Sequence, residues 1–161
     1  MIFIMLNANF YDLPILHGLD RAKITQILPI LESCVFAENS MVFQQDQEAF
    51  FLYILTFGEV IIRFKPYDGE ELTIAHIYPE GVFGWSAVLG RPNYTSSAYC
   101  SSASKAIRIR ADQLQLFCER NPELGMILLD RLASGIALRL RSTHDEVLAL
   151  LTRGLIFTPE R

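Results

Sequence analysis

Short runs of β-branched and aromatic residues, separated by turn-forming residues, dominate residues 35–110 and constrain the fold more than any other feature of the chain. Asp68-Gly69 separates two of these runs and predicts a hairpin, while Pro79 and Gly81 predict a turn after the next run. Many short strands at close spacing are typical of a barrel or a jelly roll. The runs that predict strands are MVF (41–43), FFLYIL (50–55), GEVIIRF (58–64), ELTIAHI (71–77) and KAIRIRA (105–111).

Helical patterns flank this β-rich zone on both sides. Residues 10–33 repeat apolar positions at helical spacing, with Asp20 as the expected N-cap and Pro29 as the expected end or kink. Residues 111–153 predict a short helix that ends at Asn121, followed by a long helix. The expected fold class is therefore mainly β with flanking helices: a double-stranded β-helix (jelly roll) with N-terminal helices and a long C-terminal helix. A chain of 161 residues can bury one sizeable core, so we expect a single domain over residues 1–161.

The long C-terminal helix, which we expect to begin at Pro122, repeats apolar residues in alternating steps of four and three. This pattern predicts either a helix packed on its own barrel or a parallel homodimer, and we favour the homodimer. Further leucines lie off the repeat, so one helix could contact both its own barrel and a partner; they are Leu128, Leu132, Leu138 and Leu148. The repeat consists of Leu129, Ala133, Ile136, Leu140, Thr143, Val147 and Leu150.

Composition and charge narrow the function classes. The net charge of −4 and the pI of about 5.3 argue against non-specific nucleic-acid binding, and the one basic stretch, 131–141, lies inside an amphipathic pattern. The chain ends soon after the long helix, so we expect no recognition helix and no DNA binding by this chain. No run reaches the length of a membrane span. Three widely spaced cysteines suit a reducing compartment, and we expect a cytoplasmic protein.

Three motifs, in this order and spacing, resemble the cyclic nucleotide-binding domain family over about residues 13–151. They are FFLYILTFGEV (50–60), YDGEELTIAHIYPEGVFG (67–84) and KAIRIRADQLQLFCERNPEL (105–124). The resemblance implies a regulatory or sensory module, in which a ligand reorders a phosphate-binding cassette and shifts the long helix. It also implies a separate effector protein as a partner.

The cassette of that family holds the ribose hydroxyl with a glutamate and the cyclic phosphate with an arginine. In this chain Phe83 and Gly84 match the frame of the cassette, Trp85 stands where the glutamate is expected, and Tyr94 stands where the arginine is expected. A buried phosphate that loses its guanidinium loses its main counter-charge. We therefore expect weak binding of cyclic AMP and cyclic GMP, or none.

The altered loop leaves three hypotheses open. Trp85 and Tyr94 could shape the pocket for another small polar or nucleotide-like ligand, or their rings could plug it and leave a dimeric scaffold. The chain could also be a genuine cyclic nucleotide receptor with a non-standard phosphate partner such as Arg91. On the long helix, Thr143 matches a base-contacting threonine of the family, although it also fits the apolar repeat. The other pocket candidates, which offer backbone or hydroxyl groups, are Ser86, Ala87, Thr95 and Ser96.

Catalytic and metal-binding patterns are absent from the sequence. His17, His76 and His144 are scattered, without the paired spacing of a metal site. Ser86 lacks the strand-turn-helix context of a hydrolase nucleophile. We expect neither enzyme activity nor a metal site, and no particular cofactor is indicated.

Overall fold

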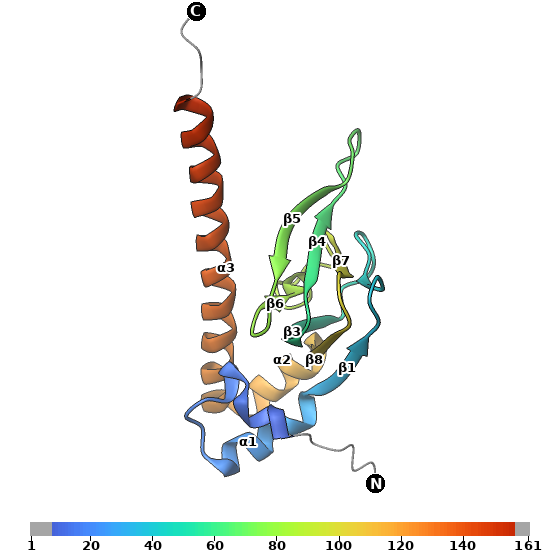
Figure 1. Ribbon diagram of the computed structural model, residues 1–161. Helices are drawn as coiled ribbons and strands as arrows, with labels where there is room; N and C mark the ends of the chain where they lie inside the picture. Colours follow the sequence, from blue (N-terminus) through green and yellow to red (C-terminus); the bar gives the residue numbers. More distant parts are fainter. Residues whose placement is uncertain (1–7, 157–161) are drawn as a thin grey trace, which may run out of the picture.

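The computed structural model describes the backbone of residues 8–156 and the side chains of residues 10–137, 139–141, 145, 148 and 151. Its strands are β1 (Glu32–Phe36), β2 (Met41–Phe43), β3 (Phe51–Phe57), β4 (Val60–Phe64), β5 (Leu72–Ile77), β6 (Val82–Phe83), β7 (Ser97–Cys100) and β8 (Ser104–Arg110). They form two four-stranded antiparallel sheets, in the orders β1-β8-β3-β6 and β2-β7-β4-β5 (Figure 1). The expected fold class, a mainly β jelly roll with flanking helices, is confirmed.

Helices precede and follow the sheets. Figure 1 shows the long α3 standing beside the sheets, with the N-terminal helices gathered at its base. The helical elements are η1 (Ala8–Asp12), η2 (Pro14–Leu16), α1 (Arg21–Ile27), η3 (Leu28–Ile30), η4 (Trp85–Ala87), α2 (Ala111–Arg120) and α3 (Pro122–Ile156).

The residues predicted to begin and to end the first helix, Asp20 and Pro29, lie at the two ends of α1 as expected. Asp20 is the N-cap, and its Oδ1 accepts a hydrogen bond of 2.9 Å from the backbone N–H of Lys23. Pro29 has no N–H to donate, and the regular helix stops at Ile27 before a single 3₁₀ turn.

The predicted boundary at residue 33 is wrong. Glu32 and Ser33 belong to β1 and pair with Arg108 and Ile107 of β8, so the helical region ends at Ile30 and the jelly roll begins at Glu32. Strand pairing with a distant part of the chain overrides a local helical pattern here. The strand β7 (Ser97–Cys100) was also not among the predicted runs, whereas the hairpin around Asp68-Gly69 joins β4 to β5 as expected.

Two clusters of buried side chains form the core. The first lies between the helices and one face of the β1-β8-β3-β6 sheet, and includes Ile27, Leu52, Ile109 and Leu128. The second lies between the two sheets and includes the rings of Phe43, Tyr53, Phe83 and Tyr94. The second cluster therefore fills the inside of the roll with aromatic side chains.

The start of α3 packs on its own domain. A Cβ on Gly125 would lie 2.7 Å from Cα of Cys118, so only glycine allows α2 and α3 to approach this closely. The side chains of Leu124, Leu128 and Leu132 are 6%, 1% and 3% exposed. The interpretation of α3 as a helix packed on its own barrel therefore holds for its first turns.

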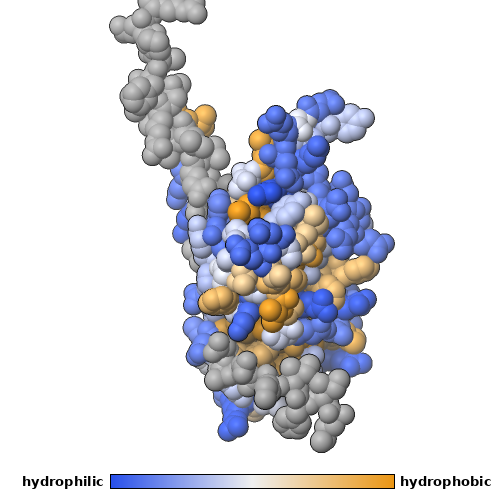
Figure 2. Space-filling view, turned by 45° about the vertical axis from the view of Figure 1, so that its right-hand side comes forward, coloured by the Kyte–Doolittle hydropathy of each residue, from blue (hydrophilic) through white to orange (hydrophobic). Residues whose placement is uncertain are grey.

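The outer surface is mainly hydrophilic on the face that Figure 2 shows, where apolar residues form separate patches. None of the helices that the structure describes is both long and apolar enough to cross a membrane.

Gly58, in the turn between β3 and β4, offers a test of this fold. Its φ is +90°, and an added Cβ would lie 2.6 Å from the Ala103 carbonyl oxygen and also clash with Oγ of Ser104. We expect Gly58→Ala to lower the free energy of unfolding by about 2–4 kcal/mol, from backbone strain and overpacking together. Urea denaturation measures this change.

Gly18→Ala is the matched control, because Gly18 has a φ of +73° but open space around its Cβ position. It should cost only the backbone strain, about 1 kcal/mol. Equal losses for the two variants would contradict the close packing of the turn.

Candidate functional site

The loop that follows β6 begins with a tight turn at Gly84. Its φ is +74°, and a Cβ there would lie 3.0 Å from both the Phe51 carbonyl oxygen and the Tyr53 ring. Glycine therefore lets the chain pass close over β3 and enter η4. The Ser86 carbonyl then accepts a hydrogen bond of 3.1 Å from the backbone N–H of Arg91, which closes the loop on itself.

Tyr94, the residue expected in place of an arginine, is held rigidly. Its hydroxyl donates to the Phe51 carbonyl oxygen at 2.7 Å and accepts from the Phe51 N–H at 3.1 Å. Its ring stacks on Phe43 with 3.7 Å between centroids, and the side chain is only 3% exposed. Burial raises the pKa of the Tyr94 phenol above its ordinary value, so this group carries no charge at neutral pH.

Only a small space remains beside Tyr94. This cassette cavity has a volume of about 20 Å³, close to the minimum that one water molecule needs. The structure brings together six of the predicted pocket residues here: Gly84, Trp85, Ser86, Tyr94, Thr95 and Ser96. Phe43, Ile62 and Arg139 complete the lining.

Three other predicted pocket residues lie elsewhere or are not described. Phe83 is a core residue with no exposed surface, and its ring stacks on Tyr53 at 5.1 Å. Ala87 lines a different surface groove, next to α2. Thr143 lies on α3, but its side chain is outside the described residues.

Arg139 is the charged residue of this cavity, and the sequence did not reveal it. It extends from α3 and places its guanidinium carbon 5.0 Å from the centre of the Trp85 ring, within the range of a cation–π contact. Burial lowers the pKa of Arg139 from its ordinary value, but an arginine remains protonated at neutral pH. The basic stretch 131–141 could have indicated that an arginine contributes to this site. The sequence does not show, however, which of its arginines turns inward.

Comparison with known proteins identifies the family. The sequence profile described as "Cyclic nucleotide-binding domain" matches residues 34–121, more than half of the chain. The chain belongs to the cyclic nucleotide-binding domain family. It is 27% identical over 137 residues to the CRP-like cAMP-activated global transcriptional regulator of Mycobacterium tuberculosis, covering 85% of this chain and 59% of that regulator. This chain thus spans less than two thirds of that relative's length.

Solved structures support the same fold. A cyclic nucleotide-binding domain from Methylobacillus flagellatus superposes with a TM-score of 0.75 at 17% identity, over 81% of this chain and 74% of that one. The regulatory subunit of a cAMP-independent protein kinase A from Trypanosoma brucei gives a TM-score of 0.62 at 18% identity, over 77% of this chain and 44% of that one.

The described residues of this cyclic nucleotide-binding domain form no metal-binding cluster. No group of three His, Cys, Asp or Glu side chains there is placed to hold a metal ion. His76 is exposed on β5, and its Nδ1 lies 2.7 Å from Oε1 of Glu59. Burial raises the pKa of the Cys34 thiol to about 11, so this thiol is a poor nucleophile at neutral pH.

Tyr94 provides a prediction about the cassette of this domain. Tyr94→Phe keeps the ring stacked on Phe43 but removes both hydrogen bonds to the Phe51 backbone. We expect the free energy of unfolding to fall by about 1–3 kcal/mol, because two backbone groups lose their partner. Thermal and urea denaturation measure this loss.

Tyr67→Phe is the matched control, because it also removes a phenol hydroxyl, but from a side chain that is 100% exposed in the loop between β4 and β5. It should leave stability unchanged. A Tyr94→Phe variant as stable as the parent would show that the Tyr94 hydroxyl does not hold the cassette.

Proposed function

We propose that this chain is a regulatory module of the cyclic nucleotide-binding family whose cassette binds cyclic AMP and cyclic GMP weakly or not at all. The observation that carries the proposal is the position of Tyr94. A neutral, 3% exposed phenol, bonded to the Phe51 backbone, stands where the family's arginine is expected. It supplies no positive charge for a cyclic phosphate.

Trp85, which also lines the cavity, supports the proposal as well. The family's glutamate would accept hydrogen bonds from the ribose, whereas an indole ring offers only its N–H as a donor. The residues that line the cassette cavity include no acidic side chain. Both polar contacts that resemblance to the family implies are therefore replaced by aromatic rings.

Arg91 does not supply the missing charge in this arrangement. Its side chain is exposed, and it does not line the cassette cavity. We therefore favour a cassette without a phosphate partner over a genuine receptor that uses Arg91 as its phosphate partner. The Trypanosoma brucei relative, described as cAMP-independent, shows that this fold also serves regulators that do not depend on cyclic AMP.

The wider role that we propose is regulatory and not enzymatic, in agreement with the transcriptional regulator that this chain resembles. Cys34, Cys100 and Cys118 are all free thiols, which supports a reducing, cytoplasmic location. A separate effector protein would receive the signal, and we propose no DNA contact by the described residues.

Isothermal titration with cyclic AMP and cyclic GMP tests this proposal. Loss of two charge-assisted contacts, each worth about 1.5–3 kcal/mol, weakens binding by roughly 10²–10⁴-fold. We expect no saturable binding by the parent chain below about 1 mM, and micromolar binding by a Trp85→Glu, Tyr94→Arg double variant.

Arg91→Gln is the control for the alternative phosphate partner and should change nothing. Micromolar binding by the parent chain would refute the proposal, and its loss in Arg91→Gln would assign the phosphate to Arg91. Thermal unfolding of the double variant, run alongside, shows whether it is folded at the titration temperature.

We also propose a homodimer through α3. Along this helix Leu129 and Leu140 of the predicted repeat are 41% and 59% exposed, and Ala133 is exposed as well. Ile136 is half-buried against the domain's own core. Val147 and Leu150 also lie on α3, with side chains outside the described residues. Large apolar side chains exposed along one helix are typical of an interface.

Light scattering coupled to gel filtration tests the dimer. The parent chain should have twice its 18.3 kDa mass, whereas Leu140→Glu should shift the mass toward the monomer by placing a charge in the interface. Arg141→Glu is the control, because Arg141 is exposed and follows Leu140 in the sequence but lies outside the repeat. It should leave the dimer intact. A monomeric parent chain would exclude this role of α3.

A second candidate function is a scaffold that binds no small ligand. The observation that favours it is the size of the cassette cavity, about 20 Å³, which no nucleotide could enter without rearrangement. If the double variant also fails to bind a cyclic nucleotide while folded, this candidate becomes the better explanation of the cassette.

A further inference from the structure

A groove beside α2 is lined by three separate segments of the chain. They are residues 87–90 of the cassette loop, the side of α2 from Ala111 to Glu119, and Leu129 at the start of α3. This α2 groove has a volume of about 590 Å³. The volume falls within the range of sites that bind small molecules, about 300–1,000 Å³. The groove is therefore large enough for a ligand of two or three rings.

Apolar side chains form much of the α2 groove. Leu114 is 3% exposed and belongs to the first core cluster. Val88 and Cys118 are half-buried and pack against the same cluster. Leu129 lines the groove from α3 and is exposed. A hydrocarbon body placed in the groove would remove this apolar surface from water, which favours binding.

The charged side chains that line the α2 groove are both acidic. They are Asp112 and Glu119, and none of the described residues that line the groove is a lysine, arginine or histidine. Both carboxylate oxygens of Asp112 accept from Nε of Arg110, at 2.9 and 3.0 Å. Glu119 accepts instead from the neutral amide Nε2 of Gln115, at 3.2 Å. The negative charge of Glu119 is therefore the one available to a ligand.

The position of Glu119 on α2 adds to the preference for a cation. Glu119 lies in the last turn of α2, which ends at Arg120. The free carbonyl groups of a last turn carry partial negative charge and stabilise a nearby cation. Arg120 itself is exposed and does not line the groove. A positively charged group is thus favoured at this end of the groove.

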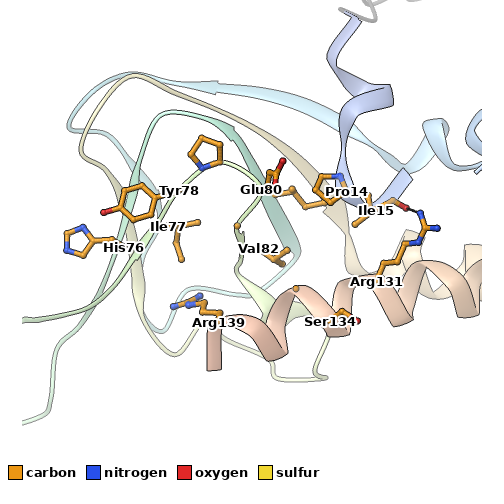
Figure 3. Close-up of a pocket in the computed structure, with 14 residues that line it drawn as sticks. Pro14, Ile15, His76, Ile77, Tyr78, Glu80, Val82, Arg131, Ser134 and Arg139 are labelled. Carbon is orange, nitrogen blue, oxygen red and sulfur yellow. Dashed lines mark hydrogen bonds between the residues drawn. The ribbon is translucent and has the colours of Figure 1, made fainter. Parts of the chain in front are cut away.

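The hollow between α3 and the segment from the end of β5 to β6 has the opposite charge. Its volume is similar, about 550 Å³, but two arginines and one glutamate line it. Figure 3 shows Arg131 toward one end of that hollow, Arg139 toward the other and Glu80 between them. Because like charges repel, an organic cation should prefer the α2 groove to this hollow.

We propose that the α2 groove binds an organic ammonium ion, with the ammonium beside Glu119 and the apolar body on Val88, Leu114 and Leu129. Such a ligand would contact the cassette loop and α2 at once, because residues 87–90 line the same groove. This site lies beyond the regulatory role proposed above and does not depend on it.

The probe for the test is 1-naphthylmethylamine, followed by NMR titration of the isotope-labelled parent chain. Its neutral analogue 1-naphthylmethanol has the same rings without the charge. We expect the amine to bind about two- to fivefold more tightly than the alcohol, as for one exposed ion pair. The backbone amide signals of Val88, Gln115 and Leu129 should shift most, and shifts confined to other parts of the chain would contradict the site.

Three variants test the role of Glu119. Glu119→Gln should abolish the preference for the amine, so that amine and alcohol bind equally. Glu119→Lys should weaken the amine further and leave the alcohol unchanged, because a like charge then faces the ammonium. Glu70→Gln is the matched control: it removes the same charge from an exposed residue of the β4–β5 hairpin and should leave the preference intact.

Leu129 also belongs to the repeat proposed to form the dimer, so the titration is repeated on Leu140→Glu. Leu140 does not line the groove, and the amine should bind this variant and the parent chain equally. Weaker binding by the parent chain would mean that a second copy of the chain, and not an amine, fills the groove.

Equal binding of amine and alcohol by the parent chain would overturn the proposal, as would no binding of either or an unchanged preference in Glu119→Gln. None of these results bears on the cassette proposal. Binding of cyclic AMP by the parent chain, in turn, would refute the cassette proposal and leave the α2 groove untouched.

Discussion

The contact between Tyr94 and the Phe51 backbone, together with the stack of Tyr94 on Phe43, fixes the cassette loop to the inside of the roll. A phenol that satisfies both backbone groups of one residue on β3 is costly to remove from its place. The loop can then turn at Gly84, and Trp85 is presented toward α3. In the function that we propose, the same ring occupies the position from which the family's arginine would bind a phosphate.

The contact of Arg139 with Trp85 gives the module a link between the cassette and α3 that requires no ligand. Its strength depends on burial, because a guanidinium over an indole ring is worth more when water is excluded. Arg139 also lines the hollow between α3 and the segment from the end of β5 to β6. The proposed dimer surface, at Leu129 and Leu140, lies on the same helix. A shift of α3 would therefore change the position of that surface.

Local signals in the sequence were sufficient for most of the fold. The N-cap at Asp20, the helix end before Pro29 and the β4–β5 hairpin all depend on residues within a few positions of one another. The strand Glu32–Phe36 was missed because its stability comes from pairing with β8, about seventy residues away in the chain. Six of the predicted pocket residues meet at one cavity, whereas Phe83 faces the core because strand alternation turns its side chain inward.

The amino-acid sequence alone determined the family and the jelly-roll class, because short-range periodicity, turn residues and motif spacing carry this information. It also led to the proposal that Trp85 and Tyr94 replace the charged anchors of the cassette. The packing of distant elements decided how little space remains beside Tyr94 and which arginine of α3 reaches Trp85. Helical periodicity places several arginines on α3, but the face that meets the sheets is selected only when Leu124, Leu128 and Leu132 are buried against the core. That burial turns Arg139 inward.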